Sequence, residues 1–502
     1  MADSLILFTI LGLVFGIYTI LPETKKFRLG YTLGPLEWCI LGYSILAILI
    51  LSLLSTYQSY HAPEAIISFF NFKLQNRFIY DIGQFLIAII LVTTTIIIFF
   101  ESNSVIHNFE YFREILEELW QNQRYTSFFT LIQENYDQIF HSGLTDSNPL
   151  LQYMDMMFAD GQFVQIIVRH QPHFGLKIAL DPSVDCDSKD SYRDAFIKEL
   201  LRNRNSRLHY EIERAQSSQP GYSKRYQIGK YNDILYLLLS DIRVSKDISA
   251  WKPIGEGVIE VLDEQYEKEC DEYNGYQQKF SIYKERCADP IFAGIAFFDL
   301  MVTEALYQKI PWHMWLYYYS HFVDKICRNY RNSRLSEPNY EFPNTYAMML
   351  AQIIYNLIDW VRIIEDDADK IECTLENSSC IPENGNIIWG SIICLSQCIR
   401  TIIISENIPN RLKRSYVDPC FRLYFDLCLN NNQTVRDHAV VLKNCLIAKH
   451  SGEEDYLKYK GCLLECFEGF DVVPYEFKEG GKAAIDSIYT LLQEGSTTEY
   501  TF

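Results

Sequence analysis

Three long apolar stretches interrupt the polar pattern of the first hundred residues. They occupy residues 5–21, 38–54 and 80–100, and the last of them runs for 21 residues with its only charge at Asp81, near the start. A helix of that length spans roughly 30 Å, the thickness of a bilayer core, at about 1.5 Å per residue. We therefore predict a transmembrane block over residues 1–100 that contains three spans.

Basic residues beside these stretches predict how the block is oriented. The first connection carries Lys25, Lys26 and Arg28, whereas the second carries only Lys73 and Arg77. Because cytoplasmic loops are enriched in Lys and Arg, we expect the first connection in the cytoplasm, the N-terminus outside and the chain after residue 100 inside. The sequence AIISFFNFKLQNRFI in the second connection is typical of an amphipathic helix in the membrane interface.

The first apolar stretch contains a small-residue pattern, Gly12-x-x-x-Gly16. Glycines four residues apart let two membrane helices approach closely. The pattern serves either packing among the spans of this chain or the assembly of a homo-oligomer.

After residue 100, apolar residues recur at the helical spacing of three and four, and no stretch alternates with a period of two. We therefore predict an all-α protein, in which three N-terminal transmembrane helices precede a large cytosolic helical domain. That domain is divided into a helical-hairpin repeat region over residues 101–215 and a C-terminal helical domain over residues 216–502.

The repeat is predicted from aromatic residues that recur 38 positions apart. The matching sets, with identical spacings of 5 and 11, are Trp120, Tyr125 and Tyr136, and Phe158, Phe163 and Phe174. An aromatic residue, a turn and a second aromatic residue resemble the tetratricopeptide-repeat class, although the small-residue positions of that class are absent. Helical repeats of this kind bind peptides or proteins. The candidates for a partner-binding groove are Trp120, Tyr125, Phe158 and Phe163, and ordinary antiparallel helix packing explains the same pattern.

The net charge of −19 lies entirely on residues 101–502, because the first hundred residues hold five basic and five acidic side chains. A domain this acidic repels phosphate, so broad nucleic-acid binding is not expected. Of the 14 cysteines, 13 follow residue 100, and none forms a Cys-x-x-Cys pair. Buried reduced thiols in a reducing compartment explain them best.

A repeated arginine phrase suggests an anion site. Residues 202–208 read RNRNSRL and residues 328–335 read RNYRNSRL. Clustered guanidinium groups bind phosphate or carboxylate through paired N–H donors, so the two phrases together would form a pocket for an anionic small ligand. Solvated helix ends are the alternative, since Arg favours a helix C-terminus. The candidate residues are Arg202, Arg204, Arg207, Arg328, Arg331 and Arg334.

Polar residues within apolar helices form a second candidate. They are Asp299, Glu304, His313, His321 and Asp324. Carboxylates in such positions are costly unless they are paired or bind a metal. No His-Glu-x-x-His spacing accompanies them, so a buried hydrogen-bond network is the expected arrangement and a metal-dependent hydrolase site the alternative.

Other chemical signals are incomplete. The acidic run at residues 365–369 lacks an EF-hand pattern, and the Gly-Gly-Lys at residues 480–482 lacks both the spacing of a phosphate-binding loop and a preceding strand. We therefore expect neither an enzyme nor a cofactor or metal site.

In layout, a few apolar spans followed by a large helical domain, the chain resembles membrane-anchored components of bacterial anti-phage (abortive-infection) systems. The resemblance implies a protein of the bacterial inner membrane whose cytosolic domain senses a signal or partner and whose spans act on the bilayer, as an oligomer. The alternative is a membrane-tethered helical-repeat scaffold that recruits a cytosolic protein.

Overall fold

The computed structural model describes most of the chain in two compact units, residues 1–192 and 193–502. The described residues are 12, 16, 19, 20, 22–32, 35–61, 66–69, 72–75, 82–87, 89, 90, 93, 106, 108–141, 149–217, 226–268, 273, 274, 286–310, 316–331, 342–367, 387–449, 453–468 and 479–494. Nearly all of them are helical, which confirms the predicted all-α class.

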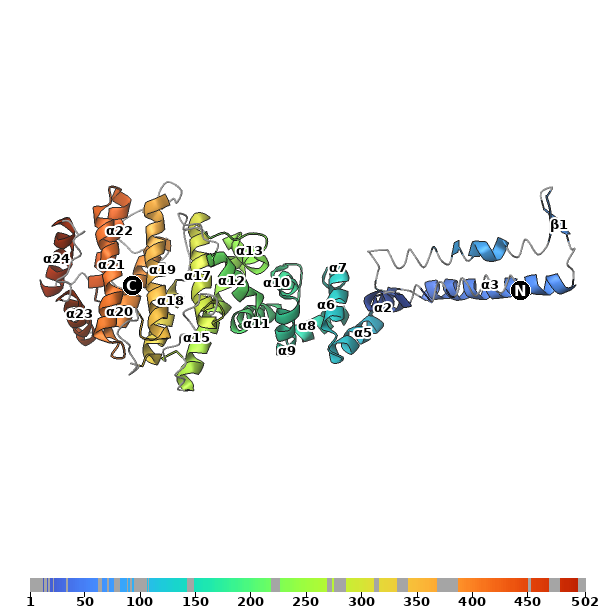
Figure 1. Ribbon diagram of the computed structural model, residues 1–502, viewed down its shortest axis with the longest axis horizontal. Coiled ribbons are helices and arrows are strands. Elements are labelled where there is room, and N and C mark those ends of the chain that lie inside the picture. The colour runs from blue at the N-terminus through green and yellow to red at the C-terminus, as the bar shows by residue number, and fades with distance from the viewer. Residues whose placement is uncertain are drawn as a thin grey trace. The chain divides into compact units, whose positions relative to one another are not determined.

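The first unit begins with two helices, α2 (Glu23–Thr32) and α3 (Pro35–His61). A two-stranded antiparallel hairpin follows, formed by β1 (Ile66–Phe69) and β2 (Phe72–Gln75), and it lies beyond the C-terminal end of α3 (Figure 1). The predicted interfacial helix in this connection is therefore wrong. Its isoleucines and phenylalanines favour strands as readily as an apolar helix face, and the short run alone cannot separate the two.

The described parts of the third apolar stretch are helical and return alongside α3. A Cβ atom added to Gly83 would lie 3.4 Å from Cδ1 of Leu51 in α3. The side chains of Ile48 and Ser55 on α3 are buried, three and four residues from Leu51. The two helices therefore pack along one narrow stripe, and the described residues leave much of the remaining surface of α3 exposed.

Helix α2 packs onto the start of the predicted repeat region, against α5 (Phe109–Gln121) and α6 (Tyr125–Glu134). The ring of Tyr31 is fully buried and meets that of Phe112 edge-on, with centroids 4.7 Å apart. Its carbonyl accepts a hydrogen bond from the backbone N–H of Asn108 at 3.3 Å, and its hydroxyl accepts one from Nδ2 of Asn135 at 3.3 Å. The first connection is therefore a docked helix rather than an open loop.

The region after α2 contains the same succession of elements twice. The first set is α5, α6 and the short α7 (Tyr136–Phe140), and the second is α8 (Pro149–Phe158), α9 (Gly161–His170) and α10 (Pro172–Leu180). Local residues start the helices of the second set. The side chain of Asp160 accepts the backbone N–H of Gln162 and caps α9, and Pro172 lies in the first turn of α10.

The second unit packs its helices side by side (Figure 1). They are α11 (Lys189–Arg202, which crosses the boundary), α12 (Arg207–Ser217), α13 (Asp233–Leu239), α14 (Ile242–Asp247), α15 (Trp251–Glu267), α17 (Pro290–Tyr307), α18 (Tyr317–Asn329), α19 (Thr345–Asp367), α20 (Ile387–Ile404), α21 (Asn410–Leu429), α22 (Gln433–Ile447), α23 (Glu453–Glu468) and α24 (Glu479–Glu494).

Helix α17 is the core of this unit. Its side chains are buried from Pro290 to Leu306, and it contacts α12, α13, α14, α15 and α19. Asp289 begins the helix, because its side chain accepts the backbone N–H groups of Ile291 and Phe292.

By length and composition, two described helices could cross a membrane, α17 and α20, and both lie in the second unit. Of their most apolar windows, 94 % and 72 % are buried inside the fold. Both therefore serve as core helices in this arrangement. In the first unit, the apolar stretch Gly42–Tyr57 of α3 is shorter than the other two but far more exposed.

Candidate functional site

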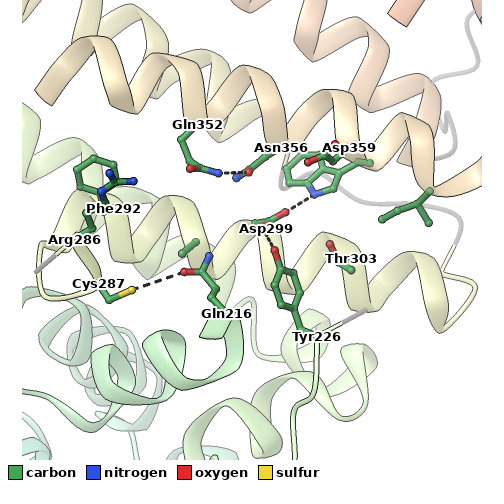
Figure 2. Close-up of a pocket in the computed structure, with 13 residues that line it drawn as sticks. Gln216, Tyr226, Arg286, Cys287, Phe292, Asp299, Thr303, Gln352, Asn356 and Asp359 are labelled. Atoms are coloured by element: carbon green, nitrogen blue, oxygen red, sulfur yellow. Dashed lines mark hydrogen bonds between the residues drawn. The ribbon is translucent and has the colours of Figure 1, made fainter. Parts of the chain in front are cut away.

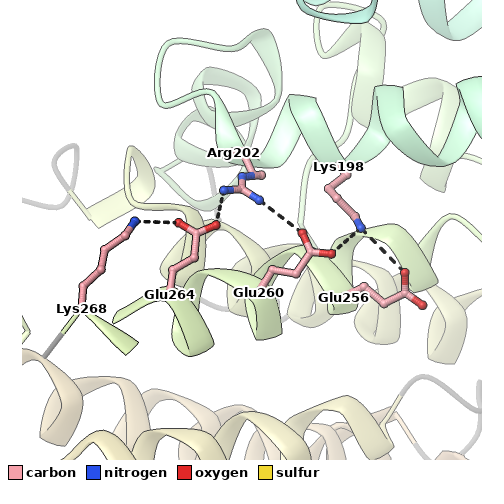
Figure 3. Close-up of polar contacts among 6 residues, drawn as sticks. All are labelled: Lys198, Arg202, Glu256, Glu260, Glu264 and Lys268. Carbon is pink, nitrogen blue, oxygen red and sulfur yellow. Dashed lines mark hydrogen bonds and ion pairs between the residues drawn. The ribbon is translucent and has the colours of Figure 1, made fainter. Parts of the chain in front are cut away.

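The arginines of the first phrase stabilise contacts between helices. Arg202 of α11 bonds both Glu260, at 3.2 Å, and Glu264 of α15, and Lys198 donates to Glu260 at 2.7 Å (Figure 3). Lys268 extends this ladder by a 3.3 Å contact to Glu264. The guanidinium group of Arg202 is therefore committed to protein carboxylates.

The other arginine candidates are likewise placed beside protein groups. Nε of Arg207 donates to the buried Glu211 at 2.8 Å, and Nη2 of Arg204 lies 3.9 Å from Asp289. Arg328 pairs with Asp324 at 2.7 Å. The backbone N–H of Arg331 donates to Asn274, and Arg334 lies outside the described residues. None of the described members lines the cavity presented below.

The four aromatic candidates for a partner groove pack against one another in the core of the first unit. Phe158 and Phe163 are buried, and Trp120 and Tyr125 are half-buried. The ring centroid of Phe163 lies 5.9 Å from that of Trp120 and 6.0 Å from that of Phe158. Their shared spacing thus reflects packing between the two hairpins, and Phe158 and Phe163 are inaccessible to a partner protein.

The glycines of the first apolar stretch, Gly12 and Gly16, have open space around them. A Cβ atom added to either would meet nothing within 4 Å. No partner for this small-residue face is therefore present among the described residues.

A cluster of polar side chains in the first unit joins α7 to the segment after α10. Its members are Asp137, His141, Asp181 and Ser183. Oγ of Ser183 lies 2.6 Å from Nε2 of His141, whose Nδ1 lies 3.1 Å from Asp137. This order resembles a serine, histidine and aspartate triad. The hydroxyl of Ser183 also bonds Asp181, however, which contacts His141 at 3.1 Å and accepts from Tyr136 at 2.7 Å.

Asp181 is the centre of that cluster. Burial acts to raise its pKa, but the hydrogen bonds from Ser183, Tyr136 and His141 outweigh it and hold the pKa well below the ordinary value. A carboxylate at this position competes for the serine proton, and Asp137 is 88 % exposed. The cluster therefore fastens two helix ends together and does not form an active site.

The polar residues predicted within apolar helices take different places. Asp299 and Glu304 are buried on α17, and Gln308 donates to Glu304 at 3.4 Å. His321 is exposed, Asp324 pairs with Arg328, and His313 lies outside the described residues. Within the described part of the chain, no group of three His, Cys, Asp or Glu side chains is arranged to hold a metal.

Asp299 lies at a cavity of about 600 Å³ in the second unit (Figure 2). The cavity lies where α17 and α19 approach the end of α12 and the segment of Tyr226. Its lining consists of Gln216, Tyr226, Arg286, Cys287, Phe292, Ala296, Asp299, Thr303, Gln352, Asn356, Asp359, Trp360 and Ile363. Volumes of 300–1,000 Å³ with an apolar wall and a few polar groups are typical of small-molecule sites.

Two neutral donors fix the carboxyl group of Asp299. The hydroxyl of Tyr226 donates to Oδ2 at 2.5 Å, and Nε1 of Trp360 donates to Oδ1 at 2.9 Å (Figure 2). The indole of Trp360 is itself held by stacking on Tyr319, with centroids 5.1 Å apart. Burial raises the pKa of Asp299 to about 6, because its two hydrogen bonds only partly offset the loss of water.

A row of polar residues on α19 forms another wall. Gln352 and Asp359 are exposed at the cavity, and Asn356 between them is buried. Nε2 of Gln352 donates to Asn356 at 2.7 Å, and Asn356 donates to the hydroxyl of Tyr319 at 2.9 Å. Amide groups fixed in this way present a defined set of donors and acceptors to a ligand.

Arg286 and Cys287, which precede α17, also line the cavity. The thiol of Cys287 donates to Gln216 at 3.7 Å (Figure 2), and Phe292 contributes an apolar surface to the same cavity. With carboxylates at one place and a guanidinium group at another, the cavity is suited to binding a polar molecule in one orientation.

Of this site, sequence reasoning found only Asp299. One signal was present: Gln352, Asn356 and Asp359 follow at spacings of four and three, so they share one face of the otherwise apolar α19. Tyr226 and Arg286 carried no such signal, because each lies outside any periodic stretch.

Comparison with known proteins leaves the cavity as the main guide to function. No family model, no curated protein sequence and no solved structure matches the chain. The fold and the site define an all-α protein with a polar cavity in its second unit and exposed apolar helices in its first.

Proposed function

We propose that the chain is a membrane-anchored receptor. Its second unit binds a small polar molecule in the cavity around Asp299, and its N-terminal apolar helices hold it in the bacterial inner membrane and act on that membrane. The resemblance in layout to anti-phage defence components motivates this role. The observation that carries it is the cavity of about 600 Å³ with a buried carboxyl group in its wall.

The exposure of α3 supports the membrane anchor. Tyr43 and Leu53 are each 70 % exposed, and Leu46 and Ile50 between them are about half exposed. Soluble proteins rarely expose continuous apolar surface of this extent, whereas lipid solvates it without cost. The 27 residues of α3 suffice to cross a bilayer core at about 1.5 Å per residue.

The docking of α2 supports the proposed orientation. Because α2 packs on α5 and α6, the first connection and the helical domain occupy the same side of the membrane. Helix α3 and the returning apolar stretch then form a hairpin that leaves this side and comes back. The basic residues of α2 favour the cytoplasm for that side.

The anchor is tested by exchange of residues 35–100 for an unrelated transmembrane hairpin in the full chain, which leaves α2 in place on α5 and α6. We expect the exchange to abolish the cellular phenotype, protection from phage or toxicity on overexpression, while the protein remains in the membrane fraction. A phenotype that survives the exchange would contradict an active role of the spans and favour the scaffold alternative. That alternative has lost support from the aromatic groove, since Phe158 and Phe163 are buried.

The cavity is tested by Ala296→Phe, which places a large side chain in its wall, in the full-length protein. We expect the variant to reach the membrane and lose the phenotype. Gly461→Ala on α23 is the matched control, because nothing lies within 4 Å of the added Cβ atom. A phenotype retained by Ala296→Phe would remove the receptor function.

A further inference from the structure

The charges around the cavity identify the kind of ligand it accepts. Asp299 and Asp359 are acidic and Arg286 is the one basic residue in the described lining, so the lining has a formal charge of −1. The whole chain adds a long-range field of the same sign, from a net charge of −19. The charge of the lining and the field of the whole chain both attract cations and repel anions.

The burial of Asp299 strengthens the attraction of the cavity for a cation. The residue is 6 % exposed, and both described hydrogen bonds of its carboxyl group come from neutral donors, Tyr226 and Trp360. Neutral donors leave its negative charge uncompensated. Each carboxylate oxygen has a second lone pair, so a cation in the cavity can bond the same group without displacing either donor.

The walls indicate an organic cation rather than a metal ion. Phe292, Ala296 and Ile363 contribute apolar surface suited to a hydrocarbon body. Hard metal ions prefer several carboxylate and other oxygen ligands close together, and among the described residues no group of three His, Cys, Asp or Glu side chains is arranged to hold one. The amides of Gln352 and Asn356 provide further polar contacts.

We propose, on the basis of the receptor function above, that the ligand is a small organic cation whose ammonium or guanidinium group binds Asp299. Asp359 at the opening adds a second carboxylate to the site. The apolar stem of the ligand lies against Phe292 and Ile363. This assignment replaces the anionic ligand expected from the arginine phrases, whose described members bond protein groups outside the cavity.

Calorimetry on the full-length protein in lipid nanodiscs tests the assignment, with agmatine and spermidine as cationic probes and adenosine monophosphate and glucose as anionic and neutral ones. We expect binding of at least one cation and of neither other probe. Asp299→Asn should weaken that binding roughly 10- to 100-fold, since a charge-assisted bond is lost. The matched control Arg202→Ala removes a charge outside the cavity and should leave the binding constant unchanged.

Two outcomes would overturn the assignment, and they bear differently on the receptor function. Binding of adenosine monophosphate or glucose that is lost on Ala296→Phe would refute the cation and leave the receptor standing. Binding of a cation that is equally strong in Asp299→Asn would place the cation elsewhere on the acidic surface. The receptor function itself fails only on the separate result that Ala296→Phe keeps the phenotype.

Discussion

At the scale of single residues, Asp299, the proposed binding residue, affects stability through its pKa. Its pKa in the folded state, about 6, exceeds the ordinary value of 3.8. The folded state therefore binds the proton more tightly than the unfolded state, so this residue contributes most stability below about pH 4 and loses that contribution as the pH rises to about 6. A binding residue kept at such a cost is an instance of stability sacrificed for function.

Replacement of Asp299 by Asn tests this cost. The side-chain oxygen of Asn still accepts from Trp360, and the hydroxyl of Tyr226 can turn to accept from the amide. We expect the variant to be more stable at pH 7, by on the order of 3 kcal/mol, and the difference to vanish near pH 4. Denaturant unfolding of the detergent-solubilised protein across this range measures it. A difference independent of pH would mean that the carboxyl group does not titrate between these values.

The contribution of His438 on α22 to stability depends on pH in the opposite direction. It is fully buried, and neither ring nitrogen has a hydrogen-bond partner among the described residues. Burial lowers its pKa from 6.5 to about 4. The unfolded state then binds the proton more tightly, so the contribution of this residue is present above about pH 6.5 and is lost as the pH falls toward 4.

The variant His438→Leu replaces the ring with an apolar side chain of similar volume that does not titrate. It should therefore remove the loss of stability that His438 causes on acidification. We expect it to exceed the wild type in stability at pH 5, with the gap widening toward pH 4 to on the order of 3 kcal/mol. Unfolding curves of the two proteins at pH 5 and pH 8 provide the comparison. If both proteins lose the same stability on acidification, another group is responsible.

Sequence reasoning could place Asp299 in the core but could not find its partners. A carboxylate within an apolar helix is a local signal, visible without coordinates. Tyr226 and Trp360, in contrast, lie 73 and 61 residues away, and only the folded topology brings them together. The arginine phrases failed for the converse reason, because their acidic partners belong to other helices whose positions the sequence does not give.

At the scale of the elements, close helix packing in the second unit depends on glycine. A Cβ atom added to Gly294 of α17 would lie 2.2 Å from Cγ2 of Val258 in α15. Contacts this short do not occur between real side chains, so α15 and α17 would have to separate. The small residue thus sets the distance between α17, which carries Asp299, and the helix beside it.

We expect Gly294→Ala to destabilise the second unit by about 1–3 kcal/mol, as overpacked cores do, despite the higher helix propensity of alanine. Gly461→Ala is the control, since the open space around it leaves only the propensity gain of about 0.5–1 kcal/mol. Thermal unfolding of both variants is the measurement. Equal stabilisation by the two changes would show that α15 and α17 do not pack this closely.

Helical periodicity predicted the long elements of this chain well, and short ones poorly. The start of α17 can be read from the sequence, because the capping chemistry of Asp289 and Pro290 is local. The hairpin of β1 and β2 was missed, because four-residue apolar strands lack the length that separates a strand from a helix face. Likewise, the sequence alone does not reveal α2 as a docked helix, since the surface that stabilises it comes from α5 and α6.

At the scale of the whole molecule, the proposed membrane hairpin of α3 and the third apolar stretch makes a topological prediction. An epitope inserted between α2 and α3, and one inserted between His141 and Pro149, should both be accessible in inside-out vesicles. An epitope inserted between β1 and β2 should be accessible only in spheroplasts. Accessibility of all three epitopes from one side would contradict the crossing of the membrane by α3. Comparison with the untagged protein in the phenotype assay controls for disturbance by the insertions.

The contact between α2 and α5 also fixes an order of assembly during synthesis. About 80 residues separate Tyr31 from Phe112, and at about 5–20 residues per second the ribosome needs roughly 4–16 s to make them. Over that interval the ring of Tyr31 lacks its partner Phe112, while in the proposed topology α3 and the returning stretch enter the bilayer. In that topology insertion comes first and the contact between α2 and α5 closes last, so a chain that fails to bring its third apolar stretch back leaves α2 undocked.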